Sequence, residues 1–308
     1  MGRPPLRSHD EIRRRQGSAA GHRVRASAAV LIALALPLLL SGCGSETLQR
    51  GWLPSTEDTT NQTGRIISLW NGSWIAAWAV GFLVWGLILW CVFAYRRRRD
   101  ETGVPAQVRY NIPMEILYTV VPLMMVAVLF FYTARDQAAI ASVEEDPDLT
   151  INVVGKQWSW DFNYVDDGVY ESGVQAQLNG EPGVAETAPT LYLPVNERVQ
   201  FVLTARDVIH SFWIPAFLYK LDTIPGTTNT FQVVPQREGD FVGKCAELCG
   251  EFHSEMLFNV KVVDRSEYDA HIADLRSRGQ TGSLETNLGR SDTVTEDNAD
   301  AVESESTP

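Results

Sequence analysis

Soft metal-ligating side chains are concentrated in one short segment, residues 245–256. The segment contains two thiols, Cys245 and Cys249, followed by the imidazole of His253 and the thioether of Met256. Sulfur ligands combined with imidazole favour copper over harder cations. Beyond residue 136, Cys245 and Cys249 are the only cysteines and Met256 is the only methionine. This convergence of scarce donors predicts a metal site.

The second cysteine decides which kind of site is expected. A mononuclear blue-copper site uses two His, one Cys and a weak Met ligand, whereas two thiolates can bridge two copper ions. An electron shared between two metals changes each bond length little, so its transfer needs little reorganisation. We therefore predict a dinuclear copper site. A disulfide in an exported domain and a zinc site, for which Met is a rare ligand, remain alternatives.

A dinuclear site needs a second imidazole from another part of the chain. His210 lies between two β-rich runs, where a loop of a sandwich is expected, and His271 lies in a polar C-terminal stretch that predicts a surface position. We therefore predict His210 as the second histidine ligand.

Two apolar stretches, residues 74–95 and 116–134, contain no charged side chain. At ~1.5 Å per residue the first is about 33 Å long as a helix, enough for a bilayer core of ~30 Å. The 308-residue chain is therefore predicted to carry a transmembrane hairpin over residues 71–136, with helices at about 74–95 and 113–134. Its net charge of −12 argues against nucleic-acid binding, and four cysteines argue against a disulfide scaffold.

The first 42 residues have the order of a secretory signal: a basic region, an apolar region and a small-residue cleavage site. Residues 40–43 resemble a bacterial lipobox, which predicts lipid attachment at Cys43; ordinary cleavage near residue 42, leaving Cys43 as a free thiol, is the alternative. Removal of residues 1–42, with seven Arg and two acidic residues, changes the net charge from −12 to −17. Such a protein attracts basic partners.

The flanking charges predict the orientation of the hairpin. Four consecutive Arg at 96–99 and Arg109 mark the loop between the helices as cytoplasmic, whereas acidic residues follow the second helix. Residues 43–70 therefore form an exterior N-terminal segment, and the chain from about residue 136 is also exterior.

The rest of the chain, residues 137–278, contains short β-rich runs separated by Gly, Pro, Asp and Asn, which predicts an antiparallel sandwich or small barrel. Residues 172–189 are expected to be an inserted loop, and residues 264–278 a short helix. Residues 279–308 carry seven acidic side chains against one Arg, which predicts a disordered tail.

The copper segment, together with residues 208–212, resembles the CuA centre of cytochrome c oxidase subunit II. Residues 111–122, 155–160 and 221–226 resemble further motifs of that family, in the same order along the chain. The resemblance implies a membrane protein of α+β class, with a two-helix transmembrane hairpin followed by an all-β cupredoxin-like Greek-key domain. Lys156 and Ser159 depart from the family pattern, which has His and more often an aromatic residue there.

The resemblance also implies roles for individual residues. The copper ligands would be His210, Cys245, Cys249, His253, Met256 and the backbone carbonyl of Glu247. The Glu247 carboxylate would face a Mg or Mn ion shared with subunit I, and a solvated loop acid is its alternative. Trp158 would be the point where electrons enter, although Trp158 and Trp160 also fit one apolar face of a strand. Glu115 would be the mouth of a proton pathway, although an acid in the first turn of a helix also favours the helix dipole.

The function implied is that of a subunit of a haem-copper terminal oxidase in the bacterial cell membrane. The subunit accepts electrons from cytochrome c at a dinuclear copper centre and passes them to haem in subunit I, where oxygen is reduced to water with proton pumping. The lipoprotein start is similar to actinobacterial forms, which implies subunits I and III and a membrane-tethered c-type cytochrome of a bc complex as partners. Another CuA-containing reductase subunit and a membrane-anchored copper-delivery protein are the alternatives.

Overall fold

The computed structural model describes residues 45–97, 103–104, 107–176 and 187–285. The proposed signal sequence, Cys43 and part of the inserted loop lie outside the described residues. The chain divides into two compact units, Met1–Trp52 and Leu53–Pro308. The described part of the first unit contains the short helix α2 (Ser45–Gln49). All other described elements belong to the second unit.

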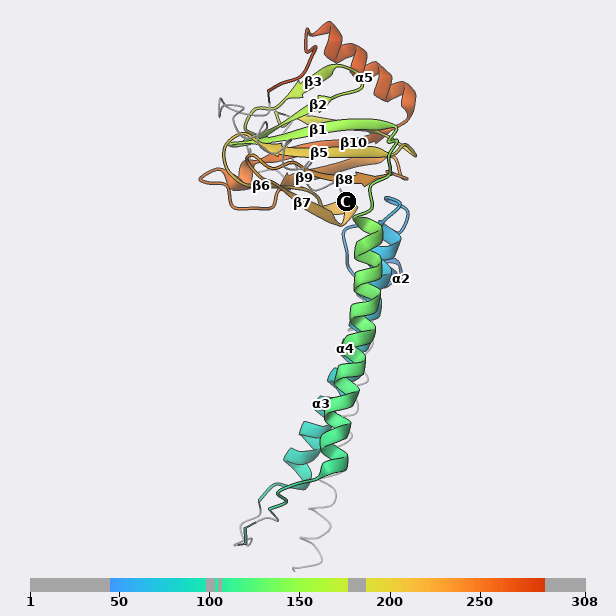
Figure 1. Ribbon diagram of the computed structural model, residues 1–308, viewed down its shortest axis with the longest axis vertical. Helices are drawn as coiled ribbons and strands as arrows, with labels where there is room; N and C mark the ends of the chain where they lie inside the picture. The colour runs from blue at the N-terminus through green and yellow to red at the C-terminus, as the bar shows by residue number, and fades with distance from the viewer. Residues whose placement is uncertain (1–44, 98–102, 105–106, 177–186, 286–308) are drawn as a thin grey trace, which may run out of the picture. The chain divides into compact units, whose positions relative to one another are not determined.

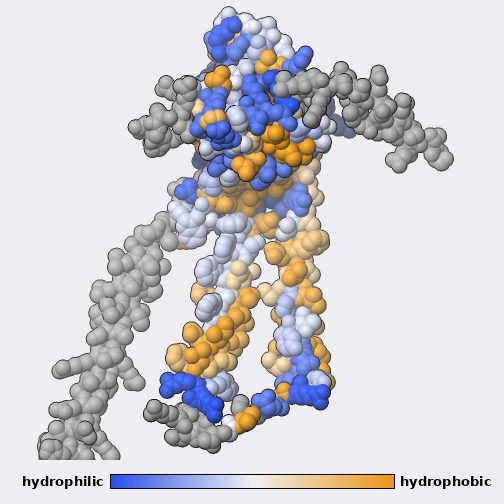
Figure 2. All heavy atoms as spheres, turned by 90° about the vertical axis from the view of Figure 1, so that its left-hand side faces the viewer, coloured by the Kyte–Doolittle hydropathy of each residue, from blue (hydrophilic) through white to orange (hydrophobic). Residues whose placement is uncertain are grey.

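Two long helices, α3 (Thr63–Ala94) and α4 (Ile112–Ile140), are long and apolar enough to cross a membrane. Figure 2 shows hydrophobic side chains along both of them, as expected for surfaces that face lipid. Both helices are longer than the apolar stretches, because polar turns precede the stretch in α3 and follow it in α4. In these turns the buried carboxylate of Asp136 pairs with Arg65 at 3.2 Å and with Arg135 at 2.8 Å. The Arg65–Asp136 ion pair joins the start of α3 to the end of α4, whereas Arg135 and Asp136 are neighbours within α4.

The β-domain consists of two five-stranded sheets (Figure 1). The first has the order β3 (Val169–Ser172), β2 (Ser159–Tyr164), β1 (Leu149–Lys156), β5 (Val199–Ala205) and β8 (Asn229–Val233). The second has the order β4 (Thr190–Pro194), β10 (Leu257–Val263), β9 (Gly239–Cys245), β6 (His210–Ile214) and β7 (Tyr219–Thr223). The two-helix and β-domain architecture confirms the predicted fold class.

One feature of the sheets differs from the expected antiparallel sandwich. The β1–β5 and β4–β10 pairs are parallel, whereas the other strand pairs are antiparallel. Parallel neighbours require a crossover connection, and here the chain between β1 and β5 passes through β4 of the opposite sheet. Short β-rich runs in the sequence do not show which distant strands become neighbours.

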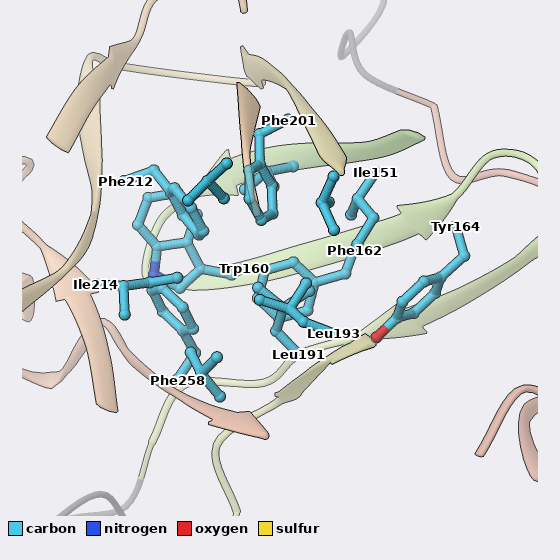
Figure 3. Close-up of a cluster of buried hydrophobic side chains, with 14 of the residues drawn as sticks. Ile151, Trp160, Phe162, Tyr164, Leu191, Leu193, Phe201, Phe212, Ile214 and Phe258 are labelled. Carbon is cyan, nitrogen blue, oxygen red and sulfur yellow. The ribbon is translucent and has the colours of Figure 1, made fainter. Parts of the chain in front are cut away.

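Aromatic side chains fill the space between the sheets and pack strands of the two sheets against each other (Figure 3). The fully buried Trp160 of β2 lies edge-on to Phe212 of β6 and Phe258 of β10, with ring centroids 5.6 Å apart in each pair. Phe212 and Phe258 stack on each other at 5.1 Å. Since aromatic pairs have preferred geometries, this cluster fixes the relative positions of β2, β6 and β10.

The chain that follows α5 (Arg265–Ser277) corrects the prediction of a tail that is disordered from residue 279. Thr281 forms a β-bridge with Val169 at the edge of β3. The side-chain amide of Asn163 accepts from the backbone N–H of Leu284 at 2.8 Å and donates to its carbonyl at 3.2 Å. Hydrogen bonds to the backbone of this segment hold it against β2 and β3, and composition alone does not show such pairing. Residues 286–308 lie outside the described residues.

Candidate metal centre

The two cysteines of the copper segment lie side by side at the end of β9 and in the loop that leads to β10. Both thiols are buried and free, and their sulfur atoms are 3.8 Å apart. A disulfide bond is ~2.05 Å long, so the arrangement in the structure is a pair of thiols. The Cys249 sulfur lies 3.5 Å from His253 Nδ1 and 3.7 Å from the Met256 sulfur.

His210 reaches the same cluster from the first residue of β6. The antiparallel register of β6 and β9 pairs Phe212 with Cys245, which places His210 beside the end of β9. The imidazole is fully buried, and its Nδ1 lies 3.9 Å from the Cys245 sulfur. Ligand atoms of His210, Cys245 and Cys249 all lie within 4.8 Å of one another.

Glu247 contacts the thiol pair through its backbone and is exposed to solvent. Its carbonyl oxygen lies 3.1 Å from the Cys245 sulfur, whereas the residue as a whole is exposed. Beside it, Leu248 is 79% exposed, and both residues line an open groove together with Val208, Ile209 and Pro225. The structure thus brings together the two thiols, two imidazoles, the thioether and this carbonyl, which is a donor set suited to copper.

Asp207 is a candidate functional residue that was not predicted from the sequence. Its carboxylate accepts a hydrogen bond from His210 Nε2 at 2.8 Å, so Nδ1 is the ring nitrogen left to face the thiols. Burial lowers the pKa of His210 despite the opposing effect of the Asp207 carboxylate, so the imidazole is neutral near pH 7 and ready to bind a metal. A carboxylate behind a histidine orients the ring and raises its basicity as a ligand. The sequence signal that could have indicated this role is the position of Asp207, three residues before His210.

The pKa of Asp207 is lowered by the groups that hold it. Burial acts to raise this pKa, but hydrogen bonds from His210 and from the backbone amides of Gln157 and Val208 outweigh that effect. The Gln157 and Val208 N–H groups each lie 2.7 Å from a carboxylate oxygen. Asp207 is therefore ionised at neutral pH and fixed in orientation.

The turn between β1 and β2 covers residues 246–256, the chain between β9 and β10, which is called the ligand loop below because it carries most of the candidate ligands. The indole N–H of Trp158 donates to the carbonyl of Cys249 at 3.3 Å, and the ring lies edge-on to Phe252 at 4.9 Å. Trp158 is half-buried, so part of its ring contacts the ligand loop and part faces solvent. Trp160 is instead fully buried in the core. The two tryptophans of this motif therefore occupy different environments.

A cluster of ion pairs around the buried Asp161 lies next to the turn between β1 and β2. Asp161 is fully buried and lies 2.6 Å from Lys156 Nζ and 3.1 Å from Arg206 Nη2. The backbone N–H of Arg206 also donates to the carbonyl of Gly155 at 2.9 Å. Lys156, which departs from the family pattern, thus has a structural partner of its own.

The other residues singled out in the sequence lie away from this cluster. Glu115 is in the first turn of α4, where its carboxylate accepts from the backbone N–H of Asn111 at 3.0 Å, and Asn111 in turn caps Met114. This arrangement is similar to a helix capping box, with the acid one residue later than usual. His271 was expected at the surface but is half-buried and stacks on Tyr192 at 3.8 Å, because α5 packs against β4 and turns this residue inward.

Burial and the neighbouring Cys245 thiol raise the pKa of Cys249 to about 12. At pH 7 this thiol is protonated, and a metal that binds the thiolate must displace the proton. We therefore expect copper binding to release protons and the apparent copper affinity to increase with pH between 6 and 8. Calorimetric titrations in buffers of different protonation enthalpy measure the number released, and binding without proton release would show that Cys249 is not a thiolate ligand.

Gly155 leaves space for the His210 ring. A Cβ atom at position 155 would lie 2.8 Å from His210 Cδ2 and 3.0 Å from Thr223 Oγ1. Gly155→Ala is therefore expected to displace the imidazole, to destabilise the domain by about 1–3 kcal/mol and to alter the copper spectrum. Chemical denaturation and optical spectra of the copper-loaded protein test this. Gly103→Ala, at a position with open space, is the control, and wild-type behaviour of Gly155→Ala would contradict the tight fit.

The comparisons with known proteins agree on one family. The family described as "Cytochrome C oxidase subunit II, periplasmic domain" matches residues 149–263. The "Probable cytochrome c oxidase subunit 2" of Streptomyces coelicolor is 48% identical over 294 residues, covering 85% of this chain and 91% of that one. The "Cytochrome c oxidase subunit 2" of Mycobacterium bovis is 34% identical over 316 residues, covering 87% and 85%.

Among solved structures, the periplasmic domain of subunit II of cytochrome oxidase of Bradyrhizobium japonicum is 32% identical. The match has a TM-score of 0.39 and covers 44% of this chain and 99% of that one.

Proposed function

The chain belongs to the cytochrome c oxidase subunit II family, and from this premise we propose that it accepts electrons from a c-type cytochrome at a dinuclear copper centre and passes them to haem in subunit I. Membership makes it a subunit of an oxidoreductase complex. Oxygen reduction to water, coupled to proton pumping, would take place in subunit I. The observation that carries the proposal is the convergence of two free thiols with His210, His253 and Met256 in one cluster.

The ligand assignment follows from which donors lie next to which thiol. Cys245 and Cys249 would hold the two coppers, with His210 nearest to Cys245 and His253 and Met256 nearest to Cys249. The Glu247 carbonyl, beside Cys245, would complete the set. When bound, this pair of metals supplies a one-electron carrier whose charge is shared between two ions. The chain supplies burial, the neutral imidazole of His210 and the Asp207 hydrogen bond that orients it.

Trp158 is proposed as the residue through which electrons reach the centre. Its half-buried indole joins the solvent-facing surface to the carbonyl of the proposed ligand Cys249. We expect Trp158→Ala to lower kcat/KM for reduced cytochrome c by at least about tenfold, because the aromatic contact with the donor and the hydrogen bond to Cys249 are both lost. Copper content is expected to stay unchanged.

Steady-state oxidation of ferrocytochrome c by the complete oxidase complex, compared with oxidation of a small diffusible amine reductant, tests this role. The proposal requires the cytochrome rate to fall more than the small-reductant rate. Equal losses with both reductants would mean that Trp158 supports the copper site rather than the contact with cytochrome.

The exposed side of Glu247 is proposed to face subunit I. Its carboxylate is a suitable oxygen ligand for a Mg or Mn ion shared between the subunits. The groove formed with Leu248, Val208, Ile209 and Pro225 provides an apolar surface for that contact. Subunit III and a c-type cytochrome tethered in a bc complex are proposed as further partners by analogy with actinobacterial relatives.

The membrane arrangement is proposed from the sequence and the two long helices. The N-terminus and the copper domain would lie on the exterior side of the bacterial cell membrane, with Cys43 lipid-attached after removal of residues 1–42. Glu115 would lie at the cytoplasmic side as the mouth of a proton pathway. Its capping hydrogen bond shows that the carboxylate also has a structural partner, Asn111.

A further inference from the structure

Gln157 connects the β1–β2 turn to the ligand loop through its side chain. Its Nε2 donates a hydrogen bond to the carbonyl oxygen of Cys249 at 2.7 Å. The same oxygen accepts from the indole N–H of Trp158 at 3.3 Å. A carbonyl oxygen has two lone pairs, so both donors can be satisfied together. Consecutive residues of the turn thus share one acceptor on a proposed ligand residue.

The backbone of Gln157 is connected to His210 through Asp207. Its N–H donates to one carboxylate oxygen of Asp207 at 2.7 Å, while the other oxygen of Asp207 accepts from His210 Nε2 at 2.8 Å. Cys249 belongs to the loop after β9, and His210 begins β6. Gln157 therefore forms a hydrogen bond directly to the ligand loop, and it is connected to His210 by hydrogen bonds through Asp207.

The packing around Gly250 shows that this contact is built into the fold. Gly250 has a φ of +128°, a conformation that favours glycine. A Cβ atom at position 250 would lie 3.1 Å from Gln157 Nε2 and 3.1 Å from the Trp158 ring. The absence of a side chain there lets the amide and the indole approach the Cys249 carbonyl from the same side.

We propose that Gln157 is a positioning residue for electron acceptance: its amide holds the Trp158 indole against the Cys249 carbonyl and keeps the β1–β2 turn in register with both ligand-bearing segments. This inference rests on the proposed function of the copper site and adds a residue to it. Without the amide, the indole retains only its own longer hydrogen bond and gains freedom to rotate away from the ligand loop. The copper ligands themselves stay in place, since Gln157 contributes no donor to the metal.

The decisive variant is Gln157→Glu in the complete oxidase complex. Glutamate has nearly the same shape, but its ionised carboxylate cannot donate to the Cys249 carbonyl and is repelled by it. We expect kcat/KM for ferrocytochrome c to fall about five- to tenfold, the size of effect that loss of one hydrogen bond produces. Copper content and the rate with a small amine reductant are expected to stay at wild-type values, because the metal-binding side chains are unchanged. The near-infrared band is expected to shift, because the carbonyl of the proposed ligand Cys249 loses a hydrogen bond. Gln157→Ala should behave like Gln157→Glu.

Gln175→Ala is the matched control, because Gln175 also donates from Nε2 at 2.7 Å, but to Glu255 rather than to a proposed ligand residue. It should change neither the cytochrome rate nor the spectrum. A wild-type kcat/KM in Gln157→Glu would overturn the proposal, as would loss of copper, which would make Gln157 a support of the metal loop. A wild-type complex without copper or without ferrocytochrome c oxidation would instead overturn the proposed function, whatever the variants do.

Discussion

Replacement of Cys249 by Ser is expected to abolish the dinuclear centre and to lower the rate of cytochrome c oxidation by at least about 100-fold. Cys249 is central to the cluster, with the sulfur of Cys245, the Nδ1 of His253 and the sulfur of Met256 all within 3.8 Å of its sulfur. A hydroxyl is a harder donor than a thiolate and cannot bridge two coppers in the same way. Loss of an outer-shell partner alone typically costs 10–100-fold, so loss of a bridging ligand should cost at least as much.

Cys91→Ser is the matched control for this variant. Cys91 is a free cysteine that is exposed on α3, so its replacement should leave copper content and turnover unchanged. Copper analysis and steady-state rates of both variants in the complete oxidase give the comparison, with thermal unfolding as a check that the domain still folds. Two coppers and a wild-type rate in Cys249→Ser would remove Cys249 from the ligand set.

Asp207→Asn is expected to lower copper affinity by about 10–100-fold, the range found for carboxylates that orient metal-binding histidines. Asparagine keeps the shape of the side chain but removes the charge that holds His210 Nε2 as a donor at 2.8 Å. The pKa of His210 should fall further, since Asp207 opposes the lowering caused by burial. Imidazole basicity as a ligand would decrease with it.

Competition titrations with a copper chelator measure the Asp207→Asn effect. Asp240→Asn serves as the control, because Asp240 is exposed on β9 and lies 3.9 Å from Lys261, away from the cluster. An affinity of Asp207→Asn equal to that of the wild type would show that the hydrogen bond does not support the histidine as a ligand.

Sequence periodicity and local spacing were sufficient to predict the parts of the structure that depend on residues close together in the sequence. The charge-free stretches predicted both long helices, and residues 245–256 contain most of the cluster within one loop. His210 was predicted because it is the imidazole that lies between β runs. The β6–β9 register explains that position, since it sets His210 beside the end of β9.

The parts that could not be predicted depend on contacts between distant segments. The roles of Gln157 and Asp207 arise from hydrogen bonds that join the β1–β2 turn, the chain before β6 and the ligand loop. Composition suggested that residue 279 begins a disordered tail, whereas the amide of Asn163 pairs with the backbone of Leu284. On the side of Leu284 this pairing uses main-chain groups, which nearly every residue carries, so the composition of the segment does not reveal it.

Electron paramagnetic resonance of the copper-loaded, one-electron-oxidised protein tests the dinuclear assignment most directly. When an unpaired electron is shared equally by two copper nuclei, its resonance signal is split into seven hyperfine lines. A single copper nucleus splits the signal into four. The cluster of Cys245, Cys249, His210 and His253 predicts seven lines with two coppers per chain. Four lines, or a copper-free protein with Cys245 and Cys249 oxidised to a disulfide, would contradict it.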